Sequence, residues 1–352
     1  MEEHNLDKQK VLQWVAACLS GFIAVIVAVP SILEKDTPAP SPTPAAFDDD
    51  APVIIERKQA ETTPSLEVAL YLTKQKKVVR LELNQYVRGV IAAEMPIEFE
   101  LEAMKAQAMA ARTYIIRRYV QQDFSNVPVA GAWVTDTIAH QAYVSDDELK
   151  QRWGADAYTA NSDKLDRAVN ETEDFILTYA DEPIQANFFS TSNGYTENSE
   201  DYWNAYIPYL RSVPSPWDIH LSPRYAETVS ISAKELQRRL GTNRMIPVSA
   251  GKSSGLRVLE TSQGRRIKKM TVGGKVFSGR EIRERLGLNS SHFQWNWKGT
   301  DLIITTFGYG HGVGMSQWGA NGMAREGKTA EEIVKHYYTG IAIQSAASLI
   351  GS

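Results

Sequence analysis

The stretch LNQYVRGVIAAEMP (residues 83–96) runs directly into IEFELEAMKAQAMAARTYIIRRYVQQ (97–122), and together they decide how the chain folds. Asn84 is a favoured N-cap residue, and Pro96 disfavours helical geometry just before it, so a first helix should end close to Glu94. In the second segment, apolar residues recur at three- and four-residue steps: Leu101, Met104, Ala108, Ala111, Ile115 and Tyr119. This period predicts a second helix, whose many alanines would let another element approach closely.

Glu94 is the candidate catalytic residue of this stretch. A carboxylate at the C-terminal end of a helix lies at the negative end of the helix dipole, and Ile91, Ala92, Ala93 and Met95 surround it in sequence. Both conditions disfavour the ionised form and should raise the pKa. A carboxyl group with a raised pKa can work as a general acid near neutral pH. A solvated acid at a helix end is the alternative.

Two cations of the second helix, Lys105 and Arg112, are seven residues apart and therefore lie on one helix face. They could hold a polar ligand beside Glu94. The alternative is that they are ordinary surface cations.

A second block, FILTYADEPIQANFFSTSNGYT (175–196), predicts a hairpin that turns at Asp181–Pro183 and then enters a loop rich in hydroxyl and amide groups. Hydroxyl-rich ligands need many hydrogen-bond partners, and an aromatic ring can cover the apolar face of a sugar. The loop therefore suits sugar binding. A surface turn of small polar residues is the alternative.

A third block, LIITTFGYGHGVGMSQWGANGMAREG (302–327), has glycine at every second position from Gly308 to Gly314. No G-x-G-x-x-G frame fits these alternating glycines, which argues against a dinucleotide-binding loop. The glycines would let backbone pass close to a ligand or to another chain segment. His311 would lie on a tight loop, where a buried, hydrogen-bonded histidine is the alternative interpretation, and Gln317 would open the next helix.

The segment YVRGVIAAEMPIEFELEAMKAQAMAARTYI (86–115) resembles the opening motif of stage II sporulation protein D, a family of peptidoglycan lytic transglycosylases. The two later blocks match in the expected order, and the resemblance spans about residues 66–343. It implies that Glu94, in its AAEMP context, is the catalytic acid. It also implies a set of substrate-binding residues: Lys105, Arg112, Ser190, Ser192, Asn193, Tyr195, His311 and Gln317.

The resemblance implies cleavage of glycan strands between N-acetylmuramic acid and N-acetylglucosamine, with 1,6-anhydro products. It further implies a role in spore engulfment, beside an amidase and other membrane proteins of the same machinery. A lysozyme-like hydrolase is an alternative, and it would need a second carboxylate. Glu200 and Asp201 are open candidates, whereas Glu98, Glu100 and Glu102 suit the solvent side of a helix start. A non-catalytic wall-binding scaffold is the third interpretation.

Composition limits the remaining possibilities. The chain has 352 residues with 43% hydrophobic content and a net charge of −4, which fits a globular core and argues against a nucleic-acid partner. Cys18 is the single cysteine, so an intrachain disulfide is excluded. His140 falls where zinc-binding relatives use cysteines and histidines, but those cysteines are absent from this sequence. We therefore expect no metal and no other cofactor.

The N-terminal part predicts a membrane-anchored protein. Residues 11–33 form the expected transmembrane anchor, since their apolar run of residues 11–29 would make a helix of about 28 Å. Lysines are more frequent before this run than after it, which favours a cytoplasmic tail at residues 1–10 and an exported body. A cleaved signal peptide is the alternative. Residues 34–51 read as a Pro-rich linker.

Residues 52–352 form the expected exported catalytic region, with a subdomain near 224–300. Strands and helices mix here without regular alternation, which predicts an α+β fold with largely antiparallel sheets and packed helices. Strands are expected at 66–73 and 78–83. Further helices are expected at residues 146–169, 232–240, 279–288 and from 329 to Gly340.

Overall fold

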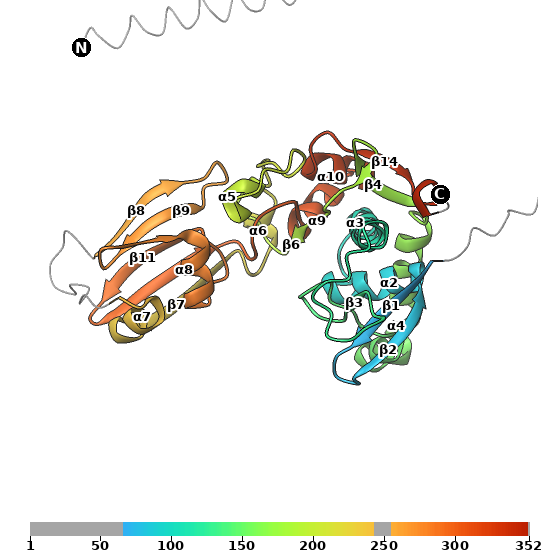
Figure 1. The fold of residues 1–352 in the computed structure, drawn as a ribbon, viewed down its shortest axis with the longest axis horizontal. Coiled ribbons are helices and arrows are strands. Elements are labelled where there is room, and N and C mark those ends of the chain that lie inside the picture. The colour runs from blue at the N-terminus through green and yellow to red at the C-terminus, as the bar shows by residue number, and fades with distance from the viewer. Residues whose placement is uncertain (1–65, 243–254, 351–352) are drawn as a thin grey trace, which may run out of the picture. The chain divides into compact units, whose positions relative to one another are not determined.

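The computed structural model describes residues 66–242 and 255–350 (Figure 1). The anchor expected at residues 11–33 and the linker expected at 34–51 lie outside the described residues. Among the residues that are described, no helix is long and apolar enough to cross a membrane. The described residues all belong to one compact unit.

Helices α2 (Leu83–Glu94) and α3 (Leu101–Val120), which the opening stretch predicts, share a hydrophobic cluster with α4 (Asp146–Asn170), the helix predicted at residues 146–169. Helix α2 ends at Glu94, as predicted, because Met95 before Pro96 is extended. The predicted N-cap at Asn84 is wrong. The helix begins at Leu83, whose backbone N–H donates to the carbonyl of Leu66, and the side chain of Asn84 donates to Glu173 instead.

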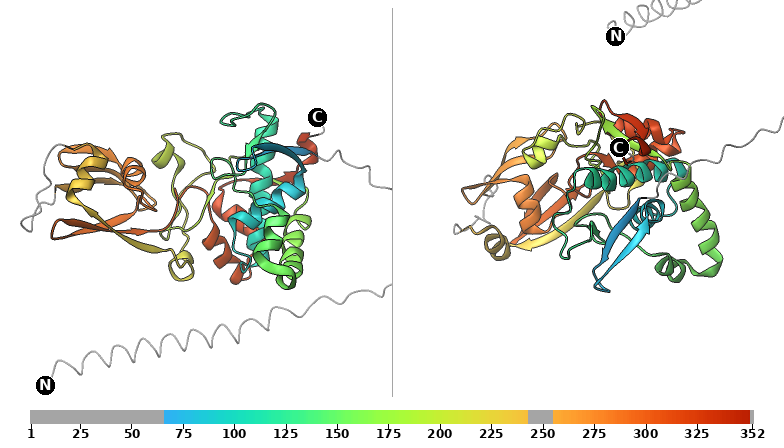
Figure 2. Two further views of the ribbon diagram at one scale, coloured as in Figure 1. Left: turned by 90° about the horizontal axis from the view of Figure 1, so that it is seen from below. Right: turned by 45° about the vertical axis from the view of Figure 1, so that its right-hand side comes forward.

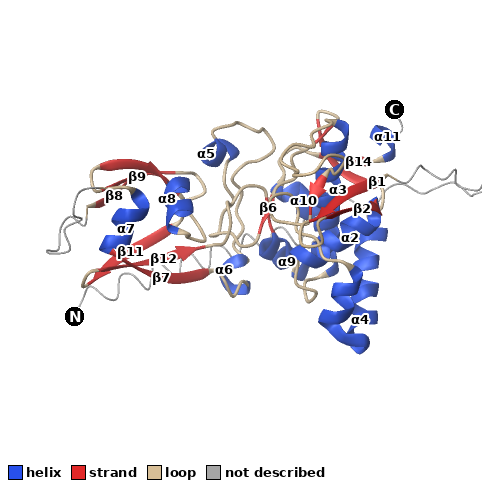
Figure 3. Cartoon of the chain, turned by 60° about the horizontal axis from the view of Figure 1, so that its bottom comes forward, coloured by secondary structure: helices blue, strands red, loops and turns tan. Residues whose placement is uncertain are grey.

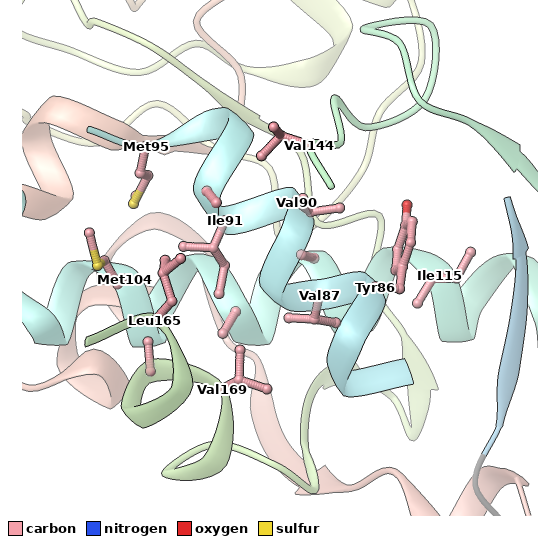
Figure 4. Packing of buried hydrophobic residues seen from close by; sticks show 14 of the residues in the cluster. Tyr86, Val87, Val90, Ile91, Met95, Met104, Ile115, Val144, Leu165 and Val169 are labelled. Atoms are coloured by element: carbon pink, nitrogen blue, oxygen red, sulfur yellow. The ribbon is translucent and has the colours of Figure 1, made fainter. Parts of the chain in front are cut away.

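The apolar face of α2 packs against both other helices, as Figure 4 shows for Val87, Val90 and Ile91. Gly89 lies at a close contact on this helix. A Cβ atom there would come within 2.1 Å of the Tyr143 ring and 2.8 Å of the Val144 carbonyl. The absent side chain therefore lets the segment before α4 run against α2, close to Glu94.

Small antiparallel sheets surround these helices. Strands β1 (Glu67–Leu72) and β2 (Lys77–Glu82) pair as predicted, and β3 (Val134–Thr135) adds to β1 in parallel. In the second block, β4 (Phe175–Tyr179) pairs with the short β5 (Glu182–Pro183). The predicted hairpin is thus present, but its second strand starts inside the expected turn.

The last strands of this part pair over longer sequence separations. Strand β14 (Ala342–Ser345) pairs antiparallel with β4, and β6 (Phe188–Phe189) lies parallel to β13 (Met315–Ser316). The second and third blocks of the sequence therefore lie side by side.

Strands β7–β12 form a second group, drawn in yellow to orange in Figures 1 and 2. Buried residues of this group form a hydrophobic cluster of their own. One sheet has the order β11-β12-β7 and the other β10-β9-β8, and all neighbours are antiparallel. The strands are β7 (Ala226–Ser232), β8 (Leu256–Thr261), β9 (Ile267–Val272), β10 (Lys275–Ser278), β11 (Phe293–Lys298) and β12 (Asp301–Phe307). Helices α7 (Ala233–Leu240) and α8 (Gly279–Leu286) pack with them, as predicted. The boundary of a subdomain near 224–300 stays a prediction.

The remaining helices are short: α5 (Ser199–Trp203), α6 (Asp218–Leu221), α9 (Gln317–Arg325), α10 (Ala330–Tyr337) and α11 (Ala347–Ile350). Helix α10 ends three residues before Gly340, the predicted end. Alanines 103, 106 and 110 of α3 share a buried cluster with residues of α9 and α10, so the small side chains do permit close packing. Within the described residues, the predicted α+β fold with largely antiparallel sheets is confirmed (Figure 3).

Candidate active site

Glu94 is contacted by two segments that lie far from it in the sequence. Its Oε1 accepts a hydrogen bond from the backbone N–H of Ala142 at 3.1 Å, in the connection between β3 and α4. Its Oε2 accepts from the side-chain amide of Gln317 at 3.5 Å, at the first turn of α9. The structure therefore brings together Glu94 and Gln317, two residues that the sequence predicts for one site.

The carboxyl group of Glu94 is partly buried. Burial raises its pKa above the ordinary value, while the hydrogen bonds from Ala142 and Gln317 act in the opposite direction. Both partners are neutral amides, so neither supplies a positive charge that would hold the carboxylate ionised. Desolvation is the largest cause of this shift, whose direction is the one that the sequence predicts.

The contact from Ala142 is a feature that sequence reasoning missed. The preceding residue, Gln141, is buried and accepts a hydrogen bond from the hydroxyl of Tyr86 at 3.0 Å. Tyr86 lies on α2 (Figure 4). Its hydrogen bond therefore ties the loop of Gln141 to the helix that carries Glu94. A backbone N–H group carries no sequence signature, and the loop has no periodicity, so no signal pointed to it.

Lys105 is engaged within the protein. Its Nζ lies 2.8 Å from Glu102 and 3.2 Å from Glu171, which joins α3 to the end of α4. The second oxygen of Glu102 accepts from the backbone N–H of Ala330 at the start of α10. These contacts give Lys105 structural partners, and the structure does not bring it to Glu94.

Arg112 does not lie at the surface, contrary to what its proposed contact with substrate requires. Its side chain is fully buried, and the guanidinium donates to the carbonyls of Val169, Thr172 and Phe175 and to the side chain of Asn84. Burial lowers its pKa to about 10. Arg112 thus bonds carbonyls at the C-terminal end of α4 and in the segment that leads into β4, which is a structural role.

The loop of the second block divides into buried and accessible residues. Ser192 and Asn193 are buried. The hydroxyl of Ser192 donates to Ser215, and the amide of Asn193 donates to the carbonyl of Gly264. Ser190 and Tyr195 are only partly buried. Of these four predicted substrate-binding residues, Ser192 and Asn193 are buried and form hydrogen bonds within the protein, so their side chains are not free to contact a ligand in this structure.

Tyr195 is also engaged at its ring. The Arg265 guanidinium lies 4.2 Å from the ring centroid and donates to the phenol oxygen at 3.0 Å. Ser190 is linked to the Glu94 site by a backbone hydrogen bond. Its carbonyl accepts from the backbone N–H of Trp318, which follows Gln317 in the sequence. Ser190 is therefore the member of this loop that the structure links most directly to the predicted acid.

The glycine-rich segment passes against other parts of the chain, as predicted. A Cβ atom at Gly314 would come within 2.0 Å of the carbonyl of Asn187, and one at Gly312 within 2.3 Å of the Arg266 guanidinium. Both glycines have positive φ values, 81° and 88°. The absent side chains are thus used for contact within the protein.

His311 is held within this segment. Its Nδ1 accepts from the backbone N–H of Val313 at 3.0 Å, and its ring packs against Phe189, Tyr202 and Trp203. Burial, with Arg283 and Arg266 nearby, lowers the pKa of His311 to about 3. The imidazole is therefore neutral at physiological pH, and this geometry matches the alternative of a hydrogen-bonded structural histidine.

Asp218 is a second residue that sequence reasoning missed. It is fully buried and accepts from the backbone N–H of Ser192 at 2.7 Å and from the hydroxyl of Ser215 at 2.6 Å. The hydroxyl of Ser316, the N-cap of α9, also donates to it. Asp218 thus connects the second block to the helix start that carries Gln317. It lies between Pro216 and Pro223, in a segment without a periodic pattern, so no signal in the sequence pointed to it.

The carboxylates considered for a hydrolase have other partners. Glu200 pairs with Arg211 at 2.5 Å, and Asp201 pairs with Lys268 at 2.7 Å. His140 bonds through its Nδ1 to the hydroxyl of Thr135 at 2.9 Å. Within residues 66–242 and 255–350, no group of three or more potential metal-ligating side chains is present.

Comparisons with known proteins place these features in a family. The family model described as "Stage II sporulation protein" matches residues 71–179, which include Glu94, Lys105 and Arg112. Stage II sporulation protein D of Bacillus amyloliquefaciens is 45% identical over 340 residues, covering 94% of this chain and 96% of the relative. Stage II sporulation protein D of Bacillus subtilis (strain 168) is 43% identical, covering 95% and 97%.

A more distant relative extends the comparison. The amidase enhancer of Bacillus subtilis (strain 168) is 29% identical over 307 residues, which covers 74% of this chain and 40% of that protein. The identity to the two sporulation proteins extends over nearly the whole chain, including all three sequence blocks. The chain therefore belongs to the stage II sporulation protein D family, whose members take part in sporulation.

Proposed function

We propose that this protein is a peptidoglycan lytic transglycosylase in which Glu94 is the general acid and then the general base. One observation carries the proposal: helix α2, which lies in the segment matched by the family model, ends in a partly buried carboxyl group that has a raised pKa and only neutral partners. Such a group keeps its proton to higher pH than a solvated glutamate and can deliver it to a leaving oxygen.

The proposed reaction needs one carboxyl group. Protonated Glu94 donates its proton to the glycosidic oxygen between N-acetylmuramic acid and N-acetylglucosamine, and the bond from the anomeric carbon to that oxygen breaks. The C6 hydroxyl of the muramic acid attacks the anomeric carbon and forms the 1,6-anhydro ring. The proton of that hydroxyl passes to the Glu94 carboxylate, so the acid is regenerated and no water is consumed.

Gln317 and Ala142 position this acid in the proposal. Their N–H groups hold the two carboxyl oxygens from opposite segments of the chain, so the side chain has a defined orientation. Gln317 can do so because Ser316 caps α9 and is itself held by Asp218. The distance of 3.5 Å from Gln317 leaves a weak contact that substrate could replace.

A hydrolase is less well supported by the contacts. A retaining or inverting hydrolase needs a second carboxylate about 5–9.5 Å from the acid. The candidates Glu200 and Asp201 are each held in an ion pair with a cation of another segment. The anhydro mechanism requires no such partner, which is why we favour it.

We further propose that the protein is anchored in the cell membrane by residues 11–33, with its body outside the cytoplasm, and acts on the wall during engulfment. Membership of a sporulation family and similarity to an amidase enhancer support work beside an amidase and other membrane proteins of that machinery. Protease added to intact protoplasts should remove the body. Full protection of the body would contradict this topology.

Product masses test the reaction type. Purified glycan strands freed of peptide are incubated with the protein, and the released fragments are analysed by mass spectrometry. Fragments with 1,6-anhydro ends, lighter by one water than hydrolytic fragments, are expected. Reducing ends would place the protein among hydrolases. An absence of cleavage, with glycan binding retained, would favour the wall-binding scaffold.

A further inference from the structure

A cavity of about 420 Å³ lies away from Glu94, between α5 and the strand group of β8–β10 with α8. Its size falls within the range of about 300–1,000 Å³ that is usual for ligand pockets. Lys268 joins the two sides, because its Nζ lies 2.7 Å from Asp201 and 2.9 Å from Glu260. The pocket is thus built from two segments that ion pairs hold together.

The charges of this pocket compensate one another. Every charged side chain that lines it takes part in an ion pair, and the buried pair of Arg266 and Glu197 at 4.0 Å is one example. Arg280 pairs with Glu284 at 2.7 Å in the same way. No uncompensated charge selects an anion or a cation. Carboxylate acceptors and ammonium or guanidinium donors nevertheless remain side by side around the cavity.

Apolar surface also reaches the pocket. Val276 of β10 lines it and is 60% exposed, and the partly buried ring of Tyr202 lies on the α5 side. A ligand that offers donors, acceptors and apolar C–H faces, without net charge, would match all of these features. Neutral sugars with hydroxyl and acetamido groups have this combination.

We propose that this pocket is a second glycan-binding site, which takes neutral N-acetylated sugar residues. The choice of sugar class rests on the glycan activity proposed above. Tyr202 connects the pocket to the glycine-rich segment, because its ring centroid lies 5.8 Å from that of His311. The site would hold glycan on the enzyme at a place separate from the scissile bond, since Glu94 does not line the cavity.

The N-acetylglucosamine tetramer serves as the probe, and calorimetry of the full-length protein measures its affinity. Val276→Trp should fill the mouth of the pocket and weaken binding by roughly tenfold or more. Val229→Trp is the matched control, because Val229 is an exposed strand valine, 38% accessible, that does not line the pocket. Hydrogen exchange should show protection by the tetramer at residues 199–204 and 275–281.

Equal affinity of wild type and Val276→Trp, or protection confined to the surroundings of Glu94, would overturn the proposal. Binding of the zwitterionic peptide Ala-Glu-Lys-Ala in place of the sugar at residues 275–281 would overturn it too. The two proposals fail in different ways. If Glu94→Gln cleaves glycan at the wild-type rate, the assignment of Glu94 as the acid is wrong, but Val276→Trp should still weaken sugar binding. If wild type and Val276→Trp bind the sugar equally well, only the proposal of a second site is wrong.

Discussion

Glu94 and Asp218 both have a carboxyl pKa that burial raises, yet their surroundings differ. Asp218 is 0% exposed and accepts from one backbone N–H and two serine hydroxyls, at distances of 2.7 Å or less. Glu94 is partly exposed and accepts from two amides at 3.1 and 3.5 Å. A raised pKa alone therefore does not identify an acid catalyst. Access to substrate and weak internal contacts separate the two residues.

We expect the largest effect from replacing Glu94, the partly exposed carboxyl group of this comparison. Glu94→Gln keeps the shape of the side chain and can still accept from Ala142, but it has no proton to deliver. Loss of general acid catalysis should lower the cleavage rate on the order of 10²–10⁴-fold. The rate is measured on purified glycan, with circular dichroism and glycan binding as controls that should not change. Cleavage at the wild-type rate would remove Glu94 from the mechanism.

Asp218→Ala tests the buried carboxyl group of the comparison through its effect on stability. The substitution leaves the Ser192 N–H and the hydroxyls of Ser215 and Ser316 without their acceptor inside the protein. We expect the free energy of unfolding to fall by roughly 3 kcal/mol or more, as measured by urea denaturation. The matched control is Asp163→Ala, an exposed aspartate of α4, which should change stability by less than about 0.5 kcal/mol. Equal stabilities for the two variants would mean that the buried network contributes little.

Arg112→Met applies the same distinction between a buried structural residue and a substrate-binding one to Arg112, a cation that the sequence predicts to bind substrate. Because Arg112 serves the carbonyls of Val169, Thr172 and Phe175, the substitution should lower the free energy of unfolding by about 1–3 kcal/mol. Cleavage per folded molecule should stay near the wild-type rate. Arg167→Met, an exposed pair member, controls for loss of charge. A stable Arg112→Met variant without activity would restore the direct substrate role.

The smallest effect concerns the second contact of Glu94. The hydrogen bond from Gln317 lowers the pKa of Glu94, so Gln317→Ala should raise it further. A general acid works only while protonated, and activity falls as pH rises through its pKa. The alkaline limb of the cleavage profile should therefore move to higher pH, and only slightly, because the contact is long. Movement to lower pH would contradict the geometry.

Patterns within a short stretch of sequence predicted part of this structure correctly. The end of α2 at Glu94 follows from Pro96, and the apolar period of α3 follows from its own residues. The start of α2 did not follow, because Leu83 is tied to Leu66 and Asn84 is used by Glu173 and Arg112. A good N-cap residue is thus overridden by a contact made far along the chain.

The candidate site shows the same division. Glu94 and Gln317 were both predicted, because each lies in a motif with its own sequence signal. The buried state of Arg112 could not be predicted, since its three carbonyl partners follow it by 57 to 63 positions. The N–H group of Ala142 and the carboxyl of Asp218 belong to connections without periodicity. Only the tertiary fold brings them to the motifs.

The most direct test of the central claim is a titration of the Glu94 carboxyl group itself. Carbon-13 NMR of protein labelled at the glutamate side chains can follow it, and the resonance is assigned by its loss in Glu94→Gln. We predict a pKa above the ordinary value of 4.5, at the same pH as the alkaline limb of kcat/KM for glycan cleavage. A pKa at or below 4.5, or a rate that does not follow this titration, would contradict the assignment of Glu94 as the proton donor.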